Sequence, residues 1–400
     1  MNRYAAMIVL SAIAFLCVAA AALVLEALRR RHVLQWLPSY FQARLRRAPQ
    51  ASGPIHLMFC FVDHFEPGWK RPGVDVERAR VARWCHDYPL LAQRFRDADG
   101  CHPKHSFFFP EEEYRPEHLE QLCQLCARGF GEIEVHLHHD NDTSEGLRRK
   151  LSRFTALLHS RHGALATDGH TGEVRWAFIH GNWCLDNSRS DGKWCGVNDE
   201  LTVLGNSGCY ADFTFPSAPS DTQPATVNSI YYATDDPQQP KSHDQGQPVT
   251  VGGSRSGDLL LIQGVLGFDW SSRKWGILPR IENSDVRAGQ PPTAARIDRW
   301  VRLAPTVQGR PEWKFIKIHT HGAPETQAEV LLGQPVERMH EYLERRYNDG
   351  SLYVLHYVSA REMFNIIKAA ERGETGDPGA YRNYVLRAPT YNQALEALSV

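Results

Sequence analysis

Residues 134–142, EVHLHHDND, place three histidines and two aspartates within nine positions at the end of an apolar segment. The segment 132–139 has the alternation expected of a β-strand. His136 and His138 are two positions apart, so their side chains leave the same face of that strand. Imidazole nitrogens are common ligands of Zn²⁺ and similar divalent ions. The segment therefore predicts two ligands of one divalent metal ion, with zinc the expected metal.

The first strand of the predicted sheet ends in further residues of this kind. The near-continuous apolar run IHLMFCFVDHFEP, residues 55–67, is typical of a strand buried on both faces, and it ends in Asp63, His64 and Glu66. One carboxylate and two imidazoles, with an open coordination position, can bind a metal ion and acidify water. Any of the three end residues could be the remaining ligand or the general base.

Hydrolysis of an amide or ester also needs an acid for the leaving group and donors near the developing oxyanion. The strand WKFIKIHTHGAPE, residues 313–325, ends in His319 and His321, either of which could be the acid. Asn182 and Tyr210 could orient the substrate or stabilise charge. We expect these groups to meet, because functional residues collect at the carboxyl ends of strands in parallel α/β sheets and barrels.

Strand-like and helix-like segments alternate along most of the chain, which predicts an α/β fold with a mainly parallel sheet covered by helices. We expect one α/β domain over residues 54–375. The Pro-, Gly- and Ser-rich stretch 217–256 is expected to be an insertion, a long surface excursion with a short hairpin at SIYYAT. Residues 376–400 are expected to be a tail.

Residues 5–28 contain about twenty consecutive apolar or small residues, enough for a helix to cross a bilayer. We therefore expect a transmembrane anchor over residues 1–28 and a basic linker over 29–53. Arginines are far more frequent after the apolar segment than before it. The positive-inside rule then places the globular domain in the cytoplasm, at a bacterial-type inner membrane.

Composition narrows the choice of partners. The formal net charge is −1 and no extended basic patch lies outside the N-terminal region, which argues against nucleic acid as the main partner. The nine cysteines lack the regular spacing of a disulfide framework. Cys123 and Cys126 form a C-x-x-C in a helical pattern, and no second cysteine pair accompanies it. We therefore expect both side chains to lie on one face of a helix rather than in a zinc knuckle.

The order of these motifs resembles the polysaccharide deacetylase family, across roughly residues 55–325. That family begins with a strand ending in two aspartates, a base and a metal ligand; FCFVDHFEP keeps Asp63 and has His64 in the second place. The metal-binding histidine motif is similar to EVHLHHDND. The resemblance implies that His136 is the first histidine ligand. The second is His138 or His139, and Asp140 is a further candidate.

Three later motifs continue the resemblance. FIHGNWCLD is similar to the arginine motif but has His180 where arginine is expected. His180, Asn182 and Trp183 are candidates for substrate contact. GCYADFTFPSA resembles the segment in which an aromatic–aspartate pair follows glycine. FIKIHTHG matches the strand that supplies the catalytic acid. These two segments imply substrate-binding roles for Tyr210 and Asp212 and the acid role for His319, with His321 the second candidate acid.

The resemblance implies a distorted (β/α) barrel and metal-dependent removal of an acyl group, usually N-acetyl, from a polysaccharide or glycolipid-linked sugar. His64 in place of the second aspartate leaves open which residue is the base, and His180 removes a fixed positive charge. Two alternatives remain. One is another barrel metallohydrolase such as a phosphoesterase, although those usually carry a His-x-His pair on the first strand. The other is a glycan-binding relative without catalysis.

Overall fold

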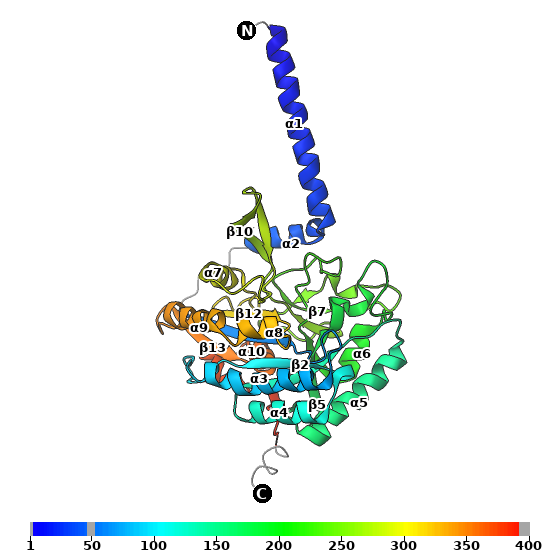
Figure 1. The fold of residues 1–400 in the computed structure, drawn as a ribbon, viewed down its shortest axis with the longest axis vertical. Helices are drawn as coiled ribbons and strands as arrows, with labels where there is room; N and C mark the ends of the chain where they lie inside the picture. The colour runs from blue at the N-terminus through cyan, green and yellow to red at the C-terminus, as the bar shows by residue number, and fades with distance from the viewer. Residues whose placement is uncertain (1–2, 46–52, 392–400) are drawn as a thin grey trace.

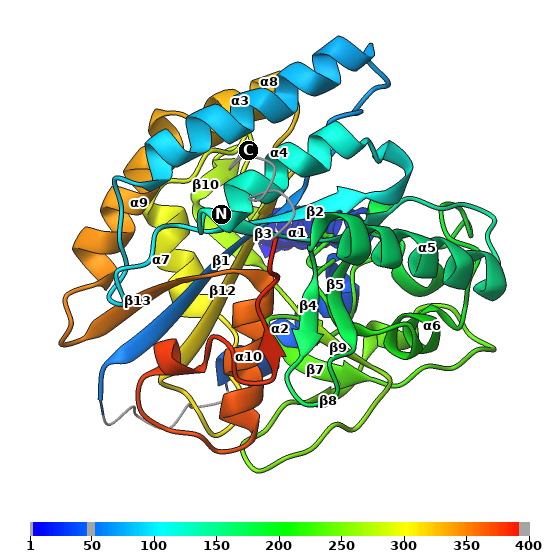
Figure 2. The same ribbon diagram turned by 90° about the horizontal axis from the view of Figure 1, so that it is seen from below.

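The structure is a computed structural model that describes residues 3–45 and 53–391. Its centre is a twelve-stranded sheet whose main path runs β12-β1-β2-β3-β5-β6-β9-β7-β8 (Figures 1 and 2). From β12 to β9 every neighbouring pair is parallel, and β13 is also parallel to β1. The predicted mixed α/β fold with a mainly parallel sheet is confirmed.

The strands are β1 (Ile55–His64), β2 (His105–Pro110), β3 (Gly131–Leu137), β4 (Ala166–Asp168), β5 (Val174–His180), β6 (Cys209–Asp212), β7 (Ile230–Ala233), β8 (Gln247–Pro248), β9 (Leu259–Ile262), β10 (Gly267–Lys274), β11 (Leu278–Glu282), β12 (Trp313–Thr320), β13 (Tyr353–Val358) and β14 (Leu386–Arg387). The α-helices are α1 (Arg3–Arg30), α2 (Val33–Leu45), α3 (Val74–Ala92), α4 (Pro116–Ala127), α5 (Ser144–His162), α6 (Glu200–Asn206), α7 (Ala294–Leu303), α8 (Glu325–Leu331), α9 (Gln334–Tyr347) and α10 (Ala360–Glu371).

Alternation along β1 separates two apolar cores. Phe59 and Phe61 pack outward into the core covered by helices such as α3, α4 and α5, whereas Cys60 and Val62 face the inner core, which α10 covers. The capping box of Ser359 and Glu362 starts α10. Because both faces of β1 are buried, its sequence is a nearly continuous apolar run.

The sheet is strongly curved, but the hydrogen bonds of the described strands do not close it into a barrel. β12 and β8 remain the ends of the path. The Lys317 amine bridges the inner side by donating to the carbonyls of Phe213 (2.6 Å) and Phe215 (2.5 Å). The closed barrel is therefore not shown. The last two strands of the path, β7 and β8, are antiparallel additions beyond β9.

Three expectations about the connecting segments need correction. Within 217–256, β7 is a buried strand of the main sheet rather than part of a surface excursion. Within the linker 29–53, α2 packs against the body through fully buried Trp36; residues 46–52 lie outside the described residues. In the tail, β14 pairs with β4 and buries Leu386, while residues 392–400 lie outside the described part.

The helix α1 stands away from the body (Figure 1). Its segment Leu10–Arg30 is long and apolar enough to cross a membrane, by length and composition. The predicted apolar N-terminal helix is thus present, whereas the side of a membrane on which the body lies stays a prediction. All nine cysteines are free, and Cys123 and Cys126 are buried in α4, as expected for a helix face.

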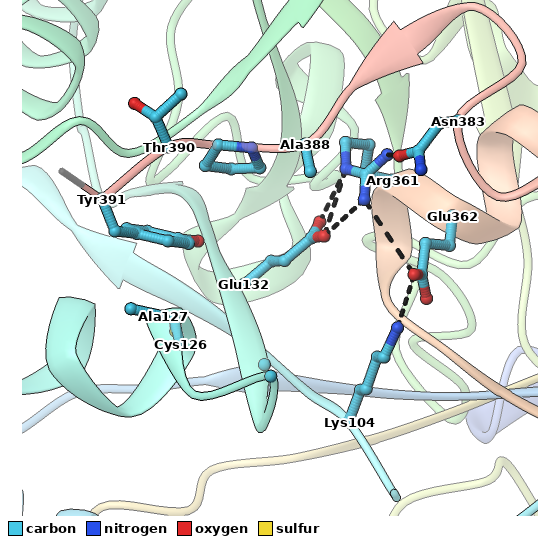
Figure 3. A pocket seen from close by; sticks show the side chains of 13 residues that line it. Lys104, Cys126, Ala127, Glu132, Arg361, Glu362, Asn383, Ala388, Thr390 and Tyr391 are labelled. Atoms are coloured by element: carbon cyan, nitrogen blue, oxygen red, sulfur yellow. Dashed lines mark hydrogen bonds and ion pairs between the residues drawn. The ribbon is translucent and has the colours of Figure 1, made fainter. Parts of the chain in front are cut away.

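At the amino ends of β2 and β3 the inner core gives way to a buried charge network (Figure 3). The Arg361 guanidinium donates to both carboxylate oxygens of Glu132, and the Lys104 amine donates to Glu362. A cavity of about 260 Å³ lies beside these groups. The network lies at the opposite end of the strands from the predicted site, so it supports the fold rather than the chemistry.

Candidate metal centre

The carboxyl ends of β1 and β3 bring three buried side chains together. The ligand atoms of His64, Glu66 and His136 all lie within 4.8 Å of one another. His136 Nε2 is 3.2 Å from Glu66 Oε1, and the rings of His64 and His136 are 4.9 Å apart. The two histidines meet because alternation points both toward the inner face of the curved sheet.

The hydrogen bonds of the two histidines fit a bound metal ion. His136 Nδ1 lies 2.7 Å from the carbonyl oxygen of Ile179, and donation there leaves a lone pair on Nε2. His64 Nε2 is buried and lacks a hydrogen-bond partner among the described residues. Buried polar nitrogens are rarely left unpaired without a reason such as a bound ion. Two imidazoles and one carboxylate are a donor set that zinc accepts.

The protonation states of His64 and Glu66 also suit metal binding. Burial, with the surrounding imidazoles, holds the pKa of His64 well below its ordinary value, so this ring is neutral. Burial alone would raise the pKa of the Glu66 carboxyl, but the His136 hydrogen bond and nearby histidines outweigh burial and lower it. His64 thus presents a neutral imidazole and Glu66 an ionised carboxylate, which are the forms that bind cations.

Further side chains border this cluster. His138 Nε2 lies 3.5 Å from Glu66 Oε1 and its Nδ1 bonds to Glu112; its side chain is 30% exposed. The His321 ring stacks on His64 at 4.4 Å. Trp183 lies within 5.4 Å of His64 and 5.3 Å of His321, measured between ring centroids. The side bearing His138 is therefore the exposed approach to the cluster.

Asp63 is not brought into the cluster, although the sequence makes it a candidate base or ligand. It follows the outward alternation of β1. Its carboxylate accepts hydrogen bonds from the Gly322 backbone N–H (2.6 Å) and from His105 Nε2 (2.8 Å). Asp63 therefore secures the loop after β12 that carries His321.

We expect Asp63→Ala to keep the bound metal but to lower the free energy of unfolding. The substitution leaves the His105 ring and the Gly322 amide without their partner, at a cost of about 1–3 kcal/mol. Metal analysis and chemical denaturation of the purified variant measure both effects. Loss of the metal from a variant as stable as the wild type would instead identify Asp63 as a ligand.

The other predicted residues lie outside the cluster of His64, Glu66 and His136. His139 and His180 belong to a separate buried cluster with Cys195 and Glu200. His319 is buried near Lys317, and burial lowers its pKa well below its ordinary value. The remaining four form hydrogen bonds with other residues. Asp140 accepts from the Trp194 amide, and the Tyr210 hydroxyl donates to Glu134. Asp212 accepts from Thr214, and the Asn182 carbonyl accepts from the Cys184 thiol.

Two acidic residues of the site were missed in the sequence. Glu112 and Glu113 follow β2 directly, in the segment FFFPEEE, and the strand-end rule could have identified them. Glu112 contacts His138 and also lines a cavity of about 430 Å³. Burial, opposed by the Gly68 amide, raises the pKa of Glu113 to about 7. The end of β2 thus adds carboxylates to the edge of the site.

Gly181 keeps the His138 ring in place. A Cβ at Gly181 would overlap that ring. We expect Gly181→Ala to displace His138 from Glu66 and to lower metal affinity by about 10–100-fold, the range found when groups that orient a metal ligand are removed. Zinc titration of the apo-protein measures the affinity, and circular dichroism checks that the fold is kept. Unchanged affinity would show that His138 does not contribute to the centre.

Comparisons with known proteins add little to this geometry. No protein-family profile matches the chain, and no curated protein matches it in sequence. The chain is similar in structure to a Mycobacterium smegmatis protein provisionally named a polysaccharide deacetylase, with 13% identity and a TM-score of 0.39 over 82% of this chain and 94% of that chain. Similarity at this level carries no weight for the activity, so the function is inferred from the site.

Proposed function

We propose that this protein is a metal-dependent hydrolase that removes an acyl group, in particular N-acetyl, from a polysaccharide or glycolipid-linked sugar. The observation that carries the proposal is the buried convergence of His64, Glu66 and His136 at the carboxyl ends of β1 and β3. The motif order along the sequence, which resembles that of polysaccharide deacetylases, supports the choice of an acyl amide as the substrate bond.

A divalent ion held by these residues would polarise the substrate carbonyl and lower the pKa of water. The residues around it are placed to move protons. His138, bonded to Glu112, can accept a proton from the attacking water at its exposed edge. His321 is half-buried, unlike the enclosed His319, so His321 is the better donor to the leaving amine.

Aromatic side chains could position a sugar ring beside the cluster. Trp69 and Trp183 both lie near the His321 ring, at centroid distances of 6.0 Å and 5.3 Å. Trp69 is 40% exposed, so one of its faces is available to a ligand. Apolar faces of sugars pack on such rings, and this arrangement favours a glycan over a small soluble ester.

The test is an assay of the full-length, detergent-solubilised protein purified without chelators. We expect acetate release from N-acetylglucosamine oligomers, loss of that release after treatment with dipicolinate, and recovery on adding Zn²⁺. Phosphate release from p-nitrophenyl phosphate without acetate release would favour a phosphoesterase. Oligomer binding with no turnover, metal present or absent, would contradict the hydrolase and favour a glycan-binding relative.

The helix α1 would anchor this activity at a membrane. We propose a bacterial-type inner membrane with the body on the cytoplasmic side, as the arginine distribution predicts. Protease treatment of sealed, inside-out vesicles should then degrade the body. Protection of the body in those vesicles would place it on the other side.

A further inference from the structure

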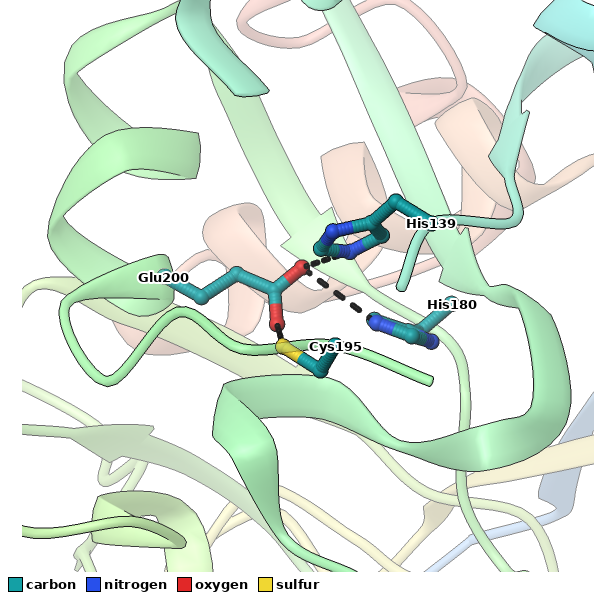
Figure 4. A group of neighbouring side chains, drawn as sticks. All are labelled: His139, His180, Cys195 and Glu200. Atoms are coloured by element: carbon teal, nitrogen blue, oxygen red, sulfur yellow. Dashed lines mark hydrogen bonds and ion pairs between the residues drawn. The ribbon is translucent and has the colours of Figure 1, made fainter. Parts of the chain in front are cut away.

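A second cluster, separate from the proposed catalytic centre, joins the loop after β5 to the sheet (Figure 4). His139 follows β3, His180 ends β5, Cys195 lies in the loop 184–199 and Glu200 begins α6. The ligand atoms of all four lie within 4.8 Å of one another, and all four residues are buried. From this arrangement we infer a second, structural zinc site with four protein ligands.

The strongest support is a nitrogen that only a cation would satisfy. His180 Nδ1 bonds to the carbonyl of Gly181, so Nε2 carries a lone pair. That Nε2 points toward Glu200 Oε1 at 3.6 Å and lacks a hydrogen-bond partner in the described chain. A metal ion between this nitrogen and the buried Glu200 carboxylate would bind both groups.

Neighbouring groups also hold His139 and Cys195 in positions that suit a shared metal ion. His139 Nε2 lies 3.2 Å from Glu200 Oε1, and Asp142 stands 3.3 Å from its Nδ1, behind the ring. A carboxylate in that position orients a metal-binding histidine. The backbone amides of Asn187 and Val197 donate to Cys195 Sγ at 3.3 and 3.4 Å. Burial and the Glu200 carboxylate outweigh these bonds and raise the pKa of the Cys195 thiol, so a metal ion would bind in place of its proton.

Four protein ligands including a thiolate fill the tetrahedral coordination that zinc prefers. No position is left for water or substrate, whereas the three-residue cluster at His64 leaves one open and borders the partly exposed His138. A metal there would fix the loop 184–199, which includes left-handed residues such as Asp186 and Trp194. The expected role is therefore to hold the loop that follows Trp183 against the sheet.

Metal content and cobalt spectra of the full-length chain test this site. We expect wild-type protein purified without chelators to hold about two zinc equivalents, of which Cys195→Ser loses one and His136→Ala loses the other. The Co²⁺-substituted wild type should show a sulfur-to-metal charge-transfer band that Cys195→Ser abolishes. Cys184→Ser is the matched control, since Cys184 is buried in the same loop but outside the cluster.

The cobalt band of the wild-type protein tests for a thiolate ligand even if a variant fails to fold. Absence of the band, with at most one metal equivalent that His136→Ala removes, would overturn the structural site and leave the catalytic proposal intact. Conversely, one equivalent lost only in Cys195→Ser would support the structural site and count against the catalytic one.

An independent observation concerns the hairpin β10–β11, which projects on the same side of the body as α1 (Figure 1). Its tip carries three exposed apolar side chains, Trp270, Trp275 and Ile277, with exposed fractions of 56%, 76% and 74%. At its base Phe268 packs on Trp36 of α2, and Leu28 at the end of α1 joins the same apolar cluster. The hairpin and the end of α1 are therefore held together.

We propose that this tip enters the interface of the membrane that α1 crosses. Tryptophan favours the headgroup region of bilayers. The segment 270–281 contains basic residues and no acidic one, and Lys274 lies 4.5 Å from the Trp275 ring. Basic side chains beside exposed indoles suit anionic phospholipid headgroups. The contact would fix the angle of the body to the bilayer.

Quenching by brominated lipids tests this contact. The full chain is reconstituted into phosphatidylcholine–phosphatidylglycerol vesicles with brominated or ordinary acyl chains. We expect bromination to quench tryptophan fluorescence less in the Trp270→Ser/Trp275→Ser variant than in the wild type. Trp194→Ser, which removes an exposed indole beside Arg189, is the control. Equal quenching of the double variant and the wild type would overturn the proposal.

Discussion

His136→Ala should lower acyl hydrolysis by about 10³-fold and remove one bound metal ion, with little change in the fold. The ring is fully buried at the end of β3, and its Nε2 faces Glu66. A metal ion contributes several kcal/mol of transition-state stabilisation, and each 1.36 kcal/mol corresponds to a tenfold change in rate. Steady-state acetate release and metal analysis of the same preparation measure the two effects.

His159→Ala provides the matched control, because His159 is an exposed histidine on α5 outside the cluster. It should keep the wild-type rate and metal content. If His136→Ala retained full activity and its metal, the centre would lie elsewhere in the molecule.

Glu132→Ala should produce the largest loss of stability, about 3–5 kcal/mol in the free energy of unfolding. Glu132 accepts three hydrogen bonds from the Arg361 guanidinium, at 2.6–3.1 Å (Figure 3). It accepts a fourth from the Ser359 hydroxyl at 2.8 Å. Removing one partner of a buried ion pair leaves an uncompensated charge in a medium of low polarity. Chemical denaturation monitored by circular dichroism measures the change.

Two comparisons isolate the charge from the packing. Glu117→Ala, which removes the partner of Arg78 on the surface, should cost less than about 1 kcal/mol. The double variant Glu132→Leu/Arg361→Met should be more stable than Glu132→Ala, because no unpaired charge remains. A Glu132→Ala protein within about 1 kcal/mol of the wild type would show that water reaches Arg361 and relieves the charge.

The parallel sheet could be predicted from the sequence because local patterns determine it. Strands such as β1 are short apolar runs that alternate with helical periodicity, and parallel strands require such crossovers. The role of β7 could not be predicted, since SIYYAT is flanked by turn-forming residues and its partner β9 comes about 28 residues later. Pairing over that separation depends on tertiary contacts rather than on local composition.

Strand alternation explains which of the predicted residues the fold brings together and which it does not. The ring positions of His136 and His64 follow from counting along strands that face the inner core. The same count assigns Asp63 to the outer face, opposite its neighbour, but the resemblance to a paired-aspartate motif concealed this. Cys195 and Glu200 had no local signal, because the loop between β5 and α6 brings them to His139 and His180 only in the folded chain.

The most direct measurement is anomalous diffraction at the zinc absorption edge from crystals of the full-length protein. The account predicts an anomalous peak about 2.0–2.2 Å from His64 Nε2, His136 Nε2 and a carboxylate oxygen of Glu66. Zinc-soaked crystals in which no peak lies at bonding distance from these three atoms would contradict the metal centre, and with it the proposed hydrolase.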